Sequence, residues 1–170
     1  LYSVLEVNLE AFRFRILNAA NDRMWNLSFF QADPAHPTEV KMVTAAPGMG
    51  LPANWPTDGR DGGVPDPTLL GPAMLQIGNE SGLLPSPVKI DPQPVVYNYN
   101  RRDIVVLNIA TKGLLLGPAE RADVVVDFSA YAGKTLILYN DAPAPAPAFD
   151  TRYDYYTGDP DQTETGGAPT

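Results

Sequence analysis

The sequence predicts an all-β protein, a Greek-key β-sandwich or barrel, and three observations favour this class. Apolar and polar residues alternate over short segments, which is the period of a strand with one face in a core. Turn-forming residues separate these segments, with 18 Pro and 14 Gly among 170 residues. Helical periodicity is almost absent. Many short strands with turn signals between them are typical of antiparallel sandwiches.

The composition excludes several classes of function. An apolar content of 44% is enough for the core of one domain. The net charge of −8 argues against nucleic acid and anionic membranes as partners, since both attract basic surfaces. No apolar run approaches the roughly 20 residues that a membrane-spanning helix needs. The chain starts at Leu1 without a Met, and we expect it to be an excised or processed fragment.

The counts of cysteine and histidine limit the chemistry further. The absence of Cys excludes disulfides, thiol catalysis and cysteine-ligated metals within this chain. A blue copper site needs a thiolate and imidazoles, and zinc sites usually need several nitrogen or sulfur ligands. The single His36 lies between Pro34 and Pro37, a poor place to orient a general base. We therefore predict no catalytic residue and no metal ligand in the chain.

The first strands follow from alternation near the N-terminus. Residues 5–9 alternate, and residues 12–16 alternate in the other phase, so a register break is expected near residues 10–11. The next strand, 24–29, places Trp25, Leu27 and Phe29 on one face. The link between these strands is rich in Asn and Asp, which predicts that they pair as a hairpin.

A long irregular insertion is expected over residues 45–72, which are dense in Pro, Gly and Asp. Loops of this length are usually functional, packed or disordered, and Trp55 argues for packing because a large aromatic side chain favours burial. Asp58, Asp61 and Asp66 could coordinate calcium, although ordinary solvated turns are the favoured interpretation.

The second half of the chain continues the β pattern. Residues 73–77 predict a strand and residues 83–90 an edge segment, because prolines cannot donate ladder hydrogen bonds. Residues 104–109 are apolar on both faces, which predicts a central strand. Residues 134–139 predict the last strand.

The stretch 116–129 combines a turn, a strand and an unusual density of charge. Gly117-Pro118 predicts the turn, and Val124, Val126 and Phe128 form the apolar face of the strand. Because unpaired charges beside a core are costly, we predict a structural charge cluster in which Asp22, Glu120 or backbone carbonyls pair with arginines. An anion-binding role for the arginines is the alternative. The predicted members are Arg13, Arg15, Arg23, Glu120, Arg121, Asp123 and Asp127.

The domain is expected to span residues 1–141, and residues 142–170 read as a Pro-rich linker and tail. The tail carries tyrosines that could stack on an aromatic substrate or pack between domains. Together with two residues of the insertion they form a predicted substrate-approach or interdomain loop: Met49, Trp55, Tyr153, Tyr155 and Tyr156.

Four motifs in order carry a resemblance to a known family. Residues 12–29, 76–85, 116–129 and 132–140 resemble the middle, or second, cupredoxin (plastocyanin-like) domain of bacterial three-domain multicopper oxidases. The group concerned is that of spore-coat laccase, bilirubin oxidase and phenoxazinone synthase. Members that resemble this sequence occur inside and outside bacterial cells.

The resemblance implies a four-copper parent enzyme that oxidises phenols, pigments or metal ions one electron at a time and reduces dioxygen to water. In that family the middle domain carries no copper ligands. The resemblance thus implies a structural domain with no cofactor of its own, whose partners are the first and third cupredoxin domains. The surfaces that meet them could also let an isolated domain self-associate.

The sequence leaves two other classes of function open. One is a β-sandwich binding module that recognises a sugar or protein through loop aromatics such as Trp55 and the tail tyrosines. An exposed aromatic strip would support it, and aromatics packed under the insertion would count against it. The other is a small oxidase in its own right, which the ligand count opposes.

Overall fold

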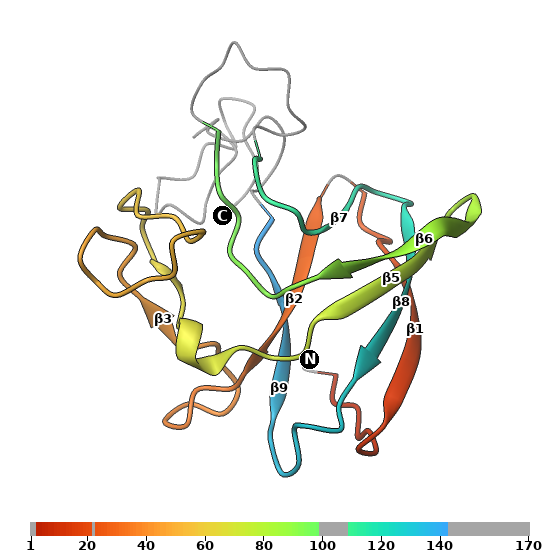
Figure 1. Cartoon of the computed structure of the whole chain (residues 1–170), viewed down its shortest axis with the longest axis horizontal. Helices are drawn as coiled ribbons and strands as arrows, with labels where there is room; N and C mark the ends of the chain where they lie inside the picture. Colours follow the sequence, from red (N-terminus) through yellow and green to blue (C-terminus); the bar gives the residue numbers. More distant parts are fainter. Residues whose placement is uncertain (1–2, 22, 99–108, 143–170) are drawn as a thin grey trace.

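The computed structural model (Figure 1) describes residues 3–21, 23–98 and 109–142. These ranges contain antiparallel strands and one 3-10 turn, η1 (Pro67–Leu69), and no α-helix. The strands are β1 (Ala11–Leu17), β2 (Trp25–Gln31), β3 (Met42–Val43), β4 (Val64–Pro65), β5 (Met74–Asn79), β6 (Gly82–Ile90), β7 (Leu114–Leu116), β8 (Arg121–Asp127) and β9 (Leu136–Asn140). The predicted all-β class is confirmed.

The larger sheet has the order β1-β8-β5-β6, so the charged strand β8 lies in its interior. Phe14 of β1 and Gln76 of β5 lie opposite Val124 on its two sides. The alternation read from the sequence is observed, because Ala122, Val124 and Val126 are buried while Arg121 and Asp127 at its ends are exposed. Strand β6 is an edge strand, as its prolines predicted.

The smaller sheet has the order β7-β2-β9, with β2 in the middle. Leu27 of β2 packs in the space between the two sheets, whereas Phe30 packs on the opposite face, against Trp55 and its neighbours. Both faces of β2 are therefore covered. The sequence had indicated only the first of them, through Trp25, Leu27 and Phe29.

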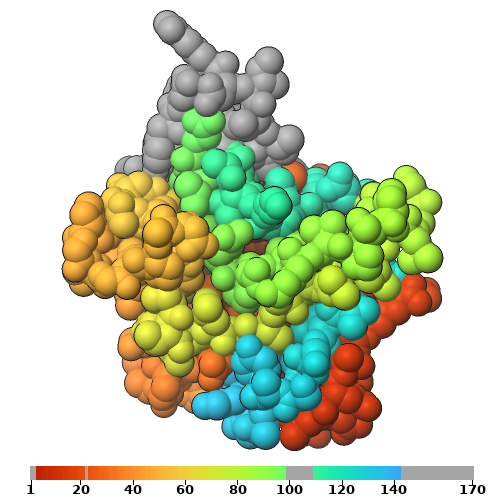
Figure 2. Space-filling model, viewed as in Figure 1, coloured from red at the N-terminus to blue at the C-terminus, as the bar shows by residue number. Residues whose placement is uncertain are grey.

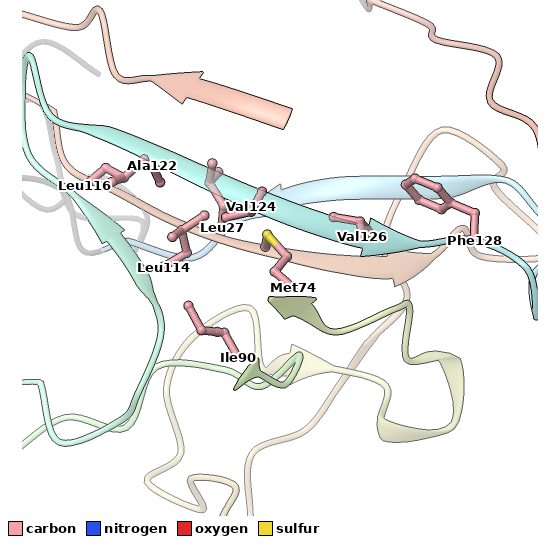
Figure 3. Packing of buried hydrophobic residues seen from close by; sticks show 9 residues of the cluster. All are labelled: Leu27, Met74, Ile90, Leu114, Leu116, Ala122, Val124, Val126 and Phe128. Atoms are coloured by element: carbon pink, nitrogen blue, oxygen red, sulfur yellow. The ribbon is translucent and has the colours of Figure 1, made fainter. Parts of the chain in front are cut away.

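The main core lies between the two sheets and takes side chains from both (Figure 3). Leu27 and Leu114 of the smaller sheet point into the same space as Met74 and Val124 of the larger one. Phe128, just after β8, adds edge-to-face contacts with Phe14 and Phe29, with ring centroids 6.1 and 5.8 Å apart. Such contacts add to the burial of apolar area that drives the sheets together. The two sheets thus form a β-sandwich.

The insertion forms a lobe beside the sandwich, seen in orange to yellow in Figure 2. It encloses a second, smaller core of Phe30, Ala45, Trp55 and Val64. The short pair β3 and β4 closes this lobe. Trp55 is 6% exposed, so the prediction that this residue packs is confirmed.

Two predictions about the N-terminal region are wrong. Strands β1 and β2 do not form a hairpin: β1 pairs with β8 and β2 pairs with β7 and β9, in different sheets. Residues 5–9 alternate in the sequence but form no strand. The predicted strand 104–109 falls largely outside the described residues; Ile109 makes an isolated bridge with Tyr97.

Candidate functional site

The predicted charge cluster is built on the outer face of the larger sheet. Arg15 lies directly opposite Asp123 in the β1–β8 register, and Arg13 lies two pairs along, opposite Val125. Arg13 makes a bidentate ion pair with Asp123, in which Nε donates to Oδ1 at 2.7 Å and Nη2 donates to Oδ2. These hydrogen bonds, with the charges of both arginines, lower the pKa of Asp123. The partner of Arg13 is thus Asp123, whereas the sequence had suggested Asp22, Glu120 or backbone carbonyls as partners for the arginines.

Glu120, Arg121 and Asp127 form hydrogen bonds at the two ends of β8. Glu120 accepts a hydrogen bond from the N–H of Gly117 at 2.6 Å, which closes the turn before the strand. The backbone N–H of Arg121 donates to Glu80, and Asp127 accepts from the N–H of Ser129 at 2.9 Å. Of the predicted members, the structure places Arg13, Arg15 and Asp123 together on the outer face of the larger sheet.

A buried asparagine, Asn18, holds the turn before β8 against the end of β1. Asn18 is fully buried, and its amide donates to the carbonyls of Leu116 at 2.9 Å and Arg23 at 2.7 Å. Its backbone N–H donates to Glu120, and its carbonyl accepts from Ala119. Ala119 has a positive φ of 67°, a conformation that costs energy in a non-glycine residue. The hydrogen bonds on either side of Ala119 hold it there.

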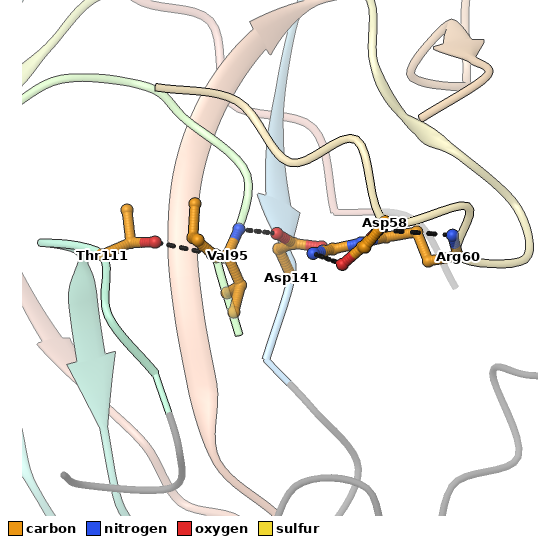
Figure 4. A network of polar contacts seen from close by, with 6 residues as sticks. Asp58, Arg60, Val95, Thr111 and Asp141 are labelled. Atoms are coloured by element: carbon orange, nitrogen blue, oxygen red, sulfur yellow. Dashed lines mark hydrogen bonds and ion pairs between the residues drawn. The ribbon is translucent and has the colours of Figure 1, made fainter. Parts of the chain in front are cut away.

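A polar network that the sequence did not predict joins the insertion to the end of β9 (Figure 4). In this network Arg60 makes an ion pair with Asp58 at 2.7 Å, and its guanidinium lies 4.6 Å from the ring centroid of Tyr97. Asp141 faces Arg60 and accepts a hydrogen bond from the N–H of Val95 at 2.5 Å. The network comes from segments far apart in the sequence, so no local spacing could have indicated it.

Asp141 has a perturbed acidity. Loss of solvent around the carboxyl raises its pKa to about 6, although the Val95 hydrogen bond and the charge of Arg60 act in the opposite direction. A carboxyl that titrates near neutral pH often marks a functional site, but structural networks produce the same effect. Because Asp141 accepts from the backbone of Val95 and its charge faces Arg60 of the insertion, a structural role for this carboxyl is the favoured interpretation.

The predicted substrate-approach or interdomain loop is only partly described. Met49 is 56% exposed at the tip of the insertion, whereas Trp55 is buried in the second core. Burial of Trp55 under the insertion counts against its use as a binding surface for a sugar or protein. Tyr153, Tyr155 and Tyr156 lie outside the described residues.

The chain does not fit a copper centre. Its only histidine, His36, lies on an exposed turn, where Nδ1 is 3.3 Å from Asp33 Oδ2. In the described part of the chain, no three His, Cys, Asp or Glu side chains are placed to hold a metal ion. Asp58 and Asp66, considered for calcium, are paired with Arg60 and Lys41. No helix within the described ranges is long and apolar enough to cross a membrane.

The two packed antiparallel sheets define a class, a β-sandwich domain of the cupredoxin-like kind. Sequence comparison relates it to particular enzymes. The chain is 28% identical to a laccase of Bacillus subtilis over 138 residues, 81% of this chain and 15% of that protein. A laccase of Haloferax volcanii is 30% identical over the same number of residues and the same shares of the two chains.

A shorter match has higher identity. Over 42 residues, 25% of this chain and 7% of the relative, the sequence is 52% identical to multicopper oxidase LPR2 of Arabidopsis thaliana. No family model matches the chain. The relatives support a domain related to multicopper oxidases, and the chain spans about 15% of the length of the laccases that it matches.

Proposed function

We propose that this chain is a copper-free structural domain of a multicopper oxidase. The observation that carries the proposal is the combination of laccase similarity over 81% of the chain with one histidine and no cysteine. A copper oxidase needs several imidazoles and a thiolate, so the residues that bind copper must lie elsewhere in the longer protein. The parent is a laccase-like enzyme that couples one-electron oxidation of phenols, pigments or metal ions to reduction of dioxygen.

The domain occupies the middle position of the parent, between a first and a third cupredoxin domain. Its role there is geometric, because electron transfer between copper centres requires that the domains carrying them keep a fixed relation. The insertion, in which Arg60 faces Asp141 and Met49 is exposed, and the tail over residues 141–156 are the segments that contact a neighbouring domain or border the substrate approach. Support comes from the order of the four motifs and from the rigidity that the second core gives the insertion.

Metal analysis and turnover test the proposal. The 170-residue chain and the longer protein are purified with copper present, and their copper content and oxidation of a laccase substrate are measured. We expect a blue, active parent and an inert chain. Tightly bound stoichiometric copper in the chain alone would exclude the copper-free role.

The position in the parent has its own test. The gene sequence on both sides of the chain is examined for His-x-His pairs and a ligand cysteine. The middle position requires copper ligands on both sides, and ligands on one side only would contradict it.

A further inference from the structure

One side of the sandwich is open along the strands β1 and β9. A cleft of about 980 Å³ lies there between the two sheets. Its floor is apolar and takes side chains from both sheets, among them Phe14, Phe29, Val124 and Phe128. Five consecutive residues from Lys134 to Leu138 line one wall, which therefore includes the first half of β9 and the two residues before it.

The hydrogen-bond register shows which groups of β9 face away from its neighbour. Ala32 N–H donates to the carbonyl of Thr135, and Asp141 N–H donates to the carbonyl of Asn26. Because such bonded pairs recur at every second residue in an antiparallel ladder, Ile137 and Tyr139 bond to β2. The N–H and C=O groups of Leu136 and Leu138 therefore point away from β2. No hydrogen bond from another described backbone group reaches them.

The N-terminal segment reaches this cleft without closing it. Residues 3–7 line the cleft, and they make no ladder with any described strand. Val4 and Leu5 remain 87% and 70% exposed, and Leu138 at the edge of β9 is 46% exposed. An apolar floor beside an unpaired strand edge is a site where an extended peptide can add to the sheet.

We propose that an added β-strand with apolar side chains at alternate positions fills this cleft and pairs with Leu136 and Leu138 of β9. The strand comes from the same longer polypeptide, on the N-terminal side of Ser3, because Ser3 already lies at the cleft. The related laccases are several times longer than the matched region and have ample chain for it. Donors and acceptors at every second residue fit a strand better than a compact apolar ligand.

Hydrogen exchange at single-amide resolution tests the proposal in the longer protein. The amides of Leu136 and Leu138 are expected to exchange as slowly as those of Ile137 and Tyr139, which bond to β2. Arg13 and Arg15 provide a matched control, because their amides point to the free edge of β1 and contribute no wall to the cleft. Exchange of Leu136 and Leu138 as fast as this control would overturn the proposal.

The same measurement on the 170-residue chain distinguishes the source of the strand. We expect at least about tenfold faster exchange of Leu136 and Leu138 there than in the longer protein, with Ile137 and Tyr139 still protected. Protection that depends on concentration, together with a dimer by light scattering, would assign the cleft to a second copy and overturn the proposal.

A pair of substitutions in the longer protein gives a second readout. Leu138→Asp places a charge in the filled cleft, whereas Leu75→Asp changes a similarly exposed residue of the larger sheet. The first is expected to speed exchange across β9 and the second to leave it unchanged. Equal behaviour of the two variants would also overturn the proposal. Because neither readout depends on copper, the proposal can fail or hold independently of the copper-free role.

Discussion

Val126 is the residue on which the main core depends most directly. Its side chain is fully buried in the middle of the larger sheet, opposite Phe12 on one side and Met74 on the other. Val126→Asp would bury an unpaired charge, so we expect a loss of several kcal/mol in the free energy of unfolding, enough to unfold the domain. Urea denaturation measures this loss.

The adjacent Val125 is the matched control, because its side chain lies on the outer face of the sheet, between Arg13 and Leu75. Val125→Asp should change the stability by less than about 1 kcal/mol. A Val126→Asp variant that melts cooperatively near the wild-type midpoint would show that the face assignment of β8 is wrong.

Asp141 gives the stability a pH dependence of unusual sign. Its pKa is raised to about 6 in the folded chain from an ordinary value of 3.8, so the unfolded chain loses this proton first. The contribution of Asp141 is therefore most favourable below about pH 4 and is lost as the pH rises through 6. Two pKa units correspond to about 3 kcal/mol, an upper figure for one carboxyl.

Asp141→Asn keeps an oxygen that can accept from Val95 N–H and removes the titration. We expect this variant to be at least as stable as the wild type at pH 7, and its stability to change less between pH 4 and pH 6. Thermal melts across this range compare the two proteins. An unchanged pH profile would mean that Asp141 does not titrate there.

At the scale of elements, Asn18 joins three of them. It connects the end of β1, the end of β7 through Leu116 and the turn before β8. Asn18→Ala leaves two carbonyls without a donor, and we expect a loss of about 1–3 kcal/mol. Asn8→Ala is the control, because it removes an exposed side-chain hydrogen bond to Glu10 and leaves the backbone bond between the two residues in place. Equal losses of stability in the two variants would mean that the buried side-chain hydrogen bonds of Asn18 do not stabilise the fold.

The sequence predicted strands better than their pairing. Period-2 alternation placed β1, β2 and β8 almost at their observed bounds, because each has one face in the main core. Alternation does not indicate which strand pairs with which. The Asn/Asp-rich link after β1 connects the larger sheet to the smaller one, so β1 and β2 are not paired. Residues 5–9 alternate equally well but have no described neighbour to pair with.

For the candidate site, the sequence likewise indicated the residues but not the contacts between them. The arginines and carboxylates on β1 and β8 could be named from the sequence, but the Arg13–Asp123 pair depends on a contact across 110 residues. The link from Arg60 to Asp141 depends on three segments that meet only in the folded chain. Burial of Trp55 was predictable because a large aromatic side chain has a strong preference for it.

At the scale of the whole molecule, the fold has two separate cores, and we expect the parts that they support to unfold separately. The main core holds the two sheets together, and the smaller one holds the insertion against β2 through Trp55 and Phe30. Trp55→Ala should cost about 3–5 kcal/mol, most of it within the insertion. We expect proteases to cut residues 45–72 in this variant while amides of β8 keep their protection from exchange.

Met49→Ala is the control for this substitution, since Met49 is largely exposed and packs in neither core. It should leave both proteolysis and exchange unchanged. Loss of β8 protection in Trp55→Ala at the same rate as cleavage of the insertion would show that the two cores unfold as one.

The prolines of β6 have a consequence for how copies of the chain can associate. Pro85 and Pro87 lie on the outer strand of the larger sheet, and a proline has no N–H to offer a further strand. Of the two edges of this sheet, β1 is therefore the one that can accept a further strand. Two copies that pair β1 to β1 leave no second receptive edge on this sheet, so growth through this contact alone stops at a pair.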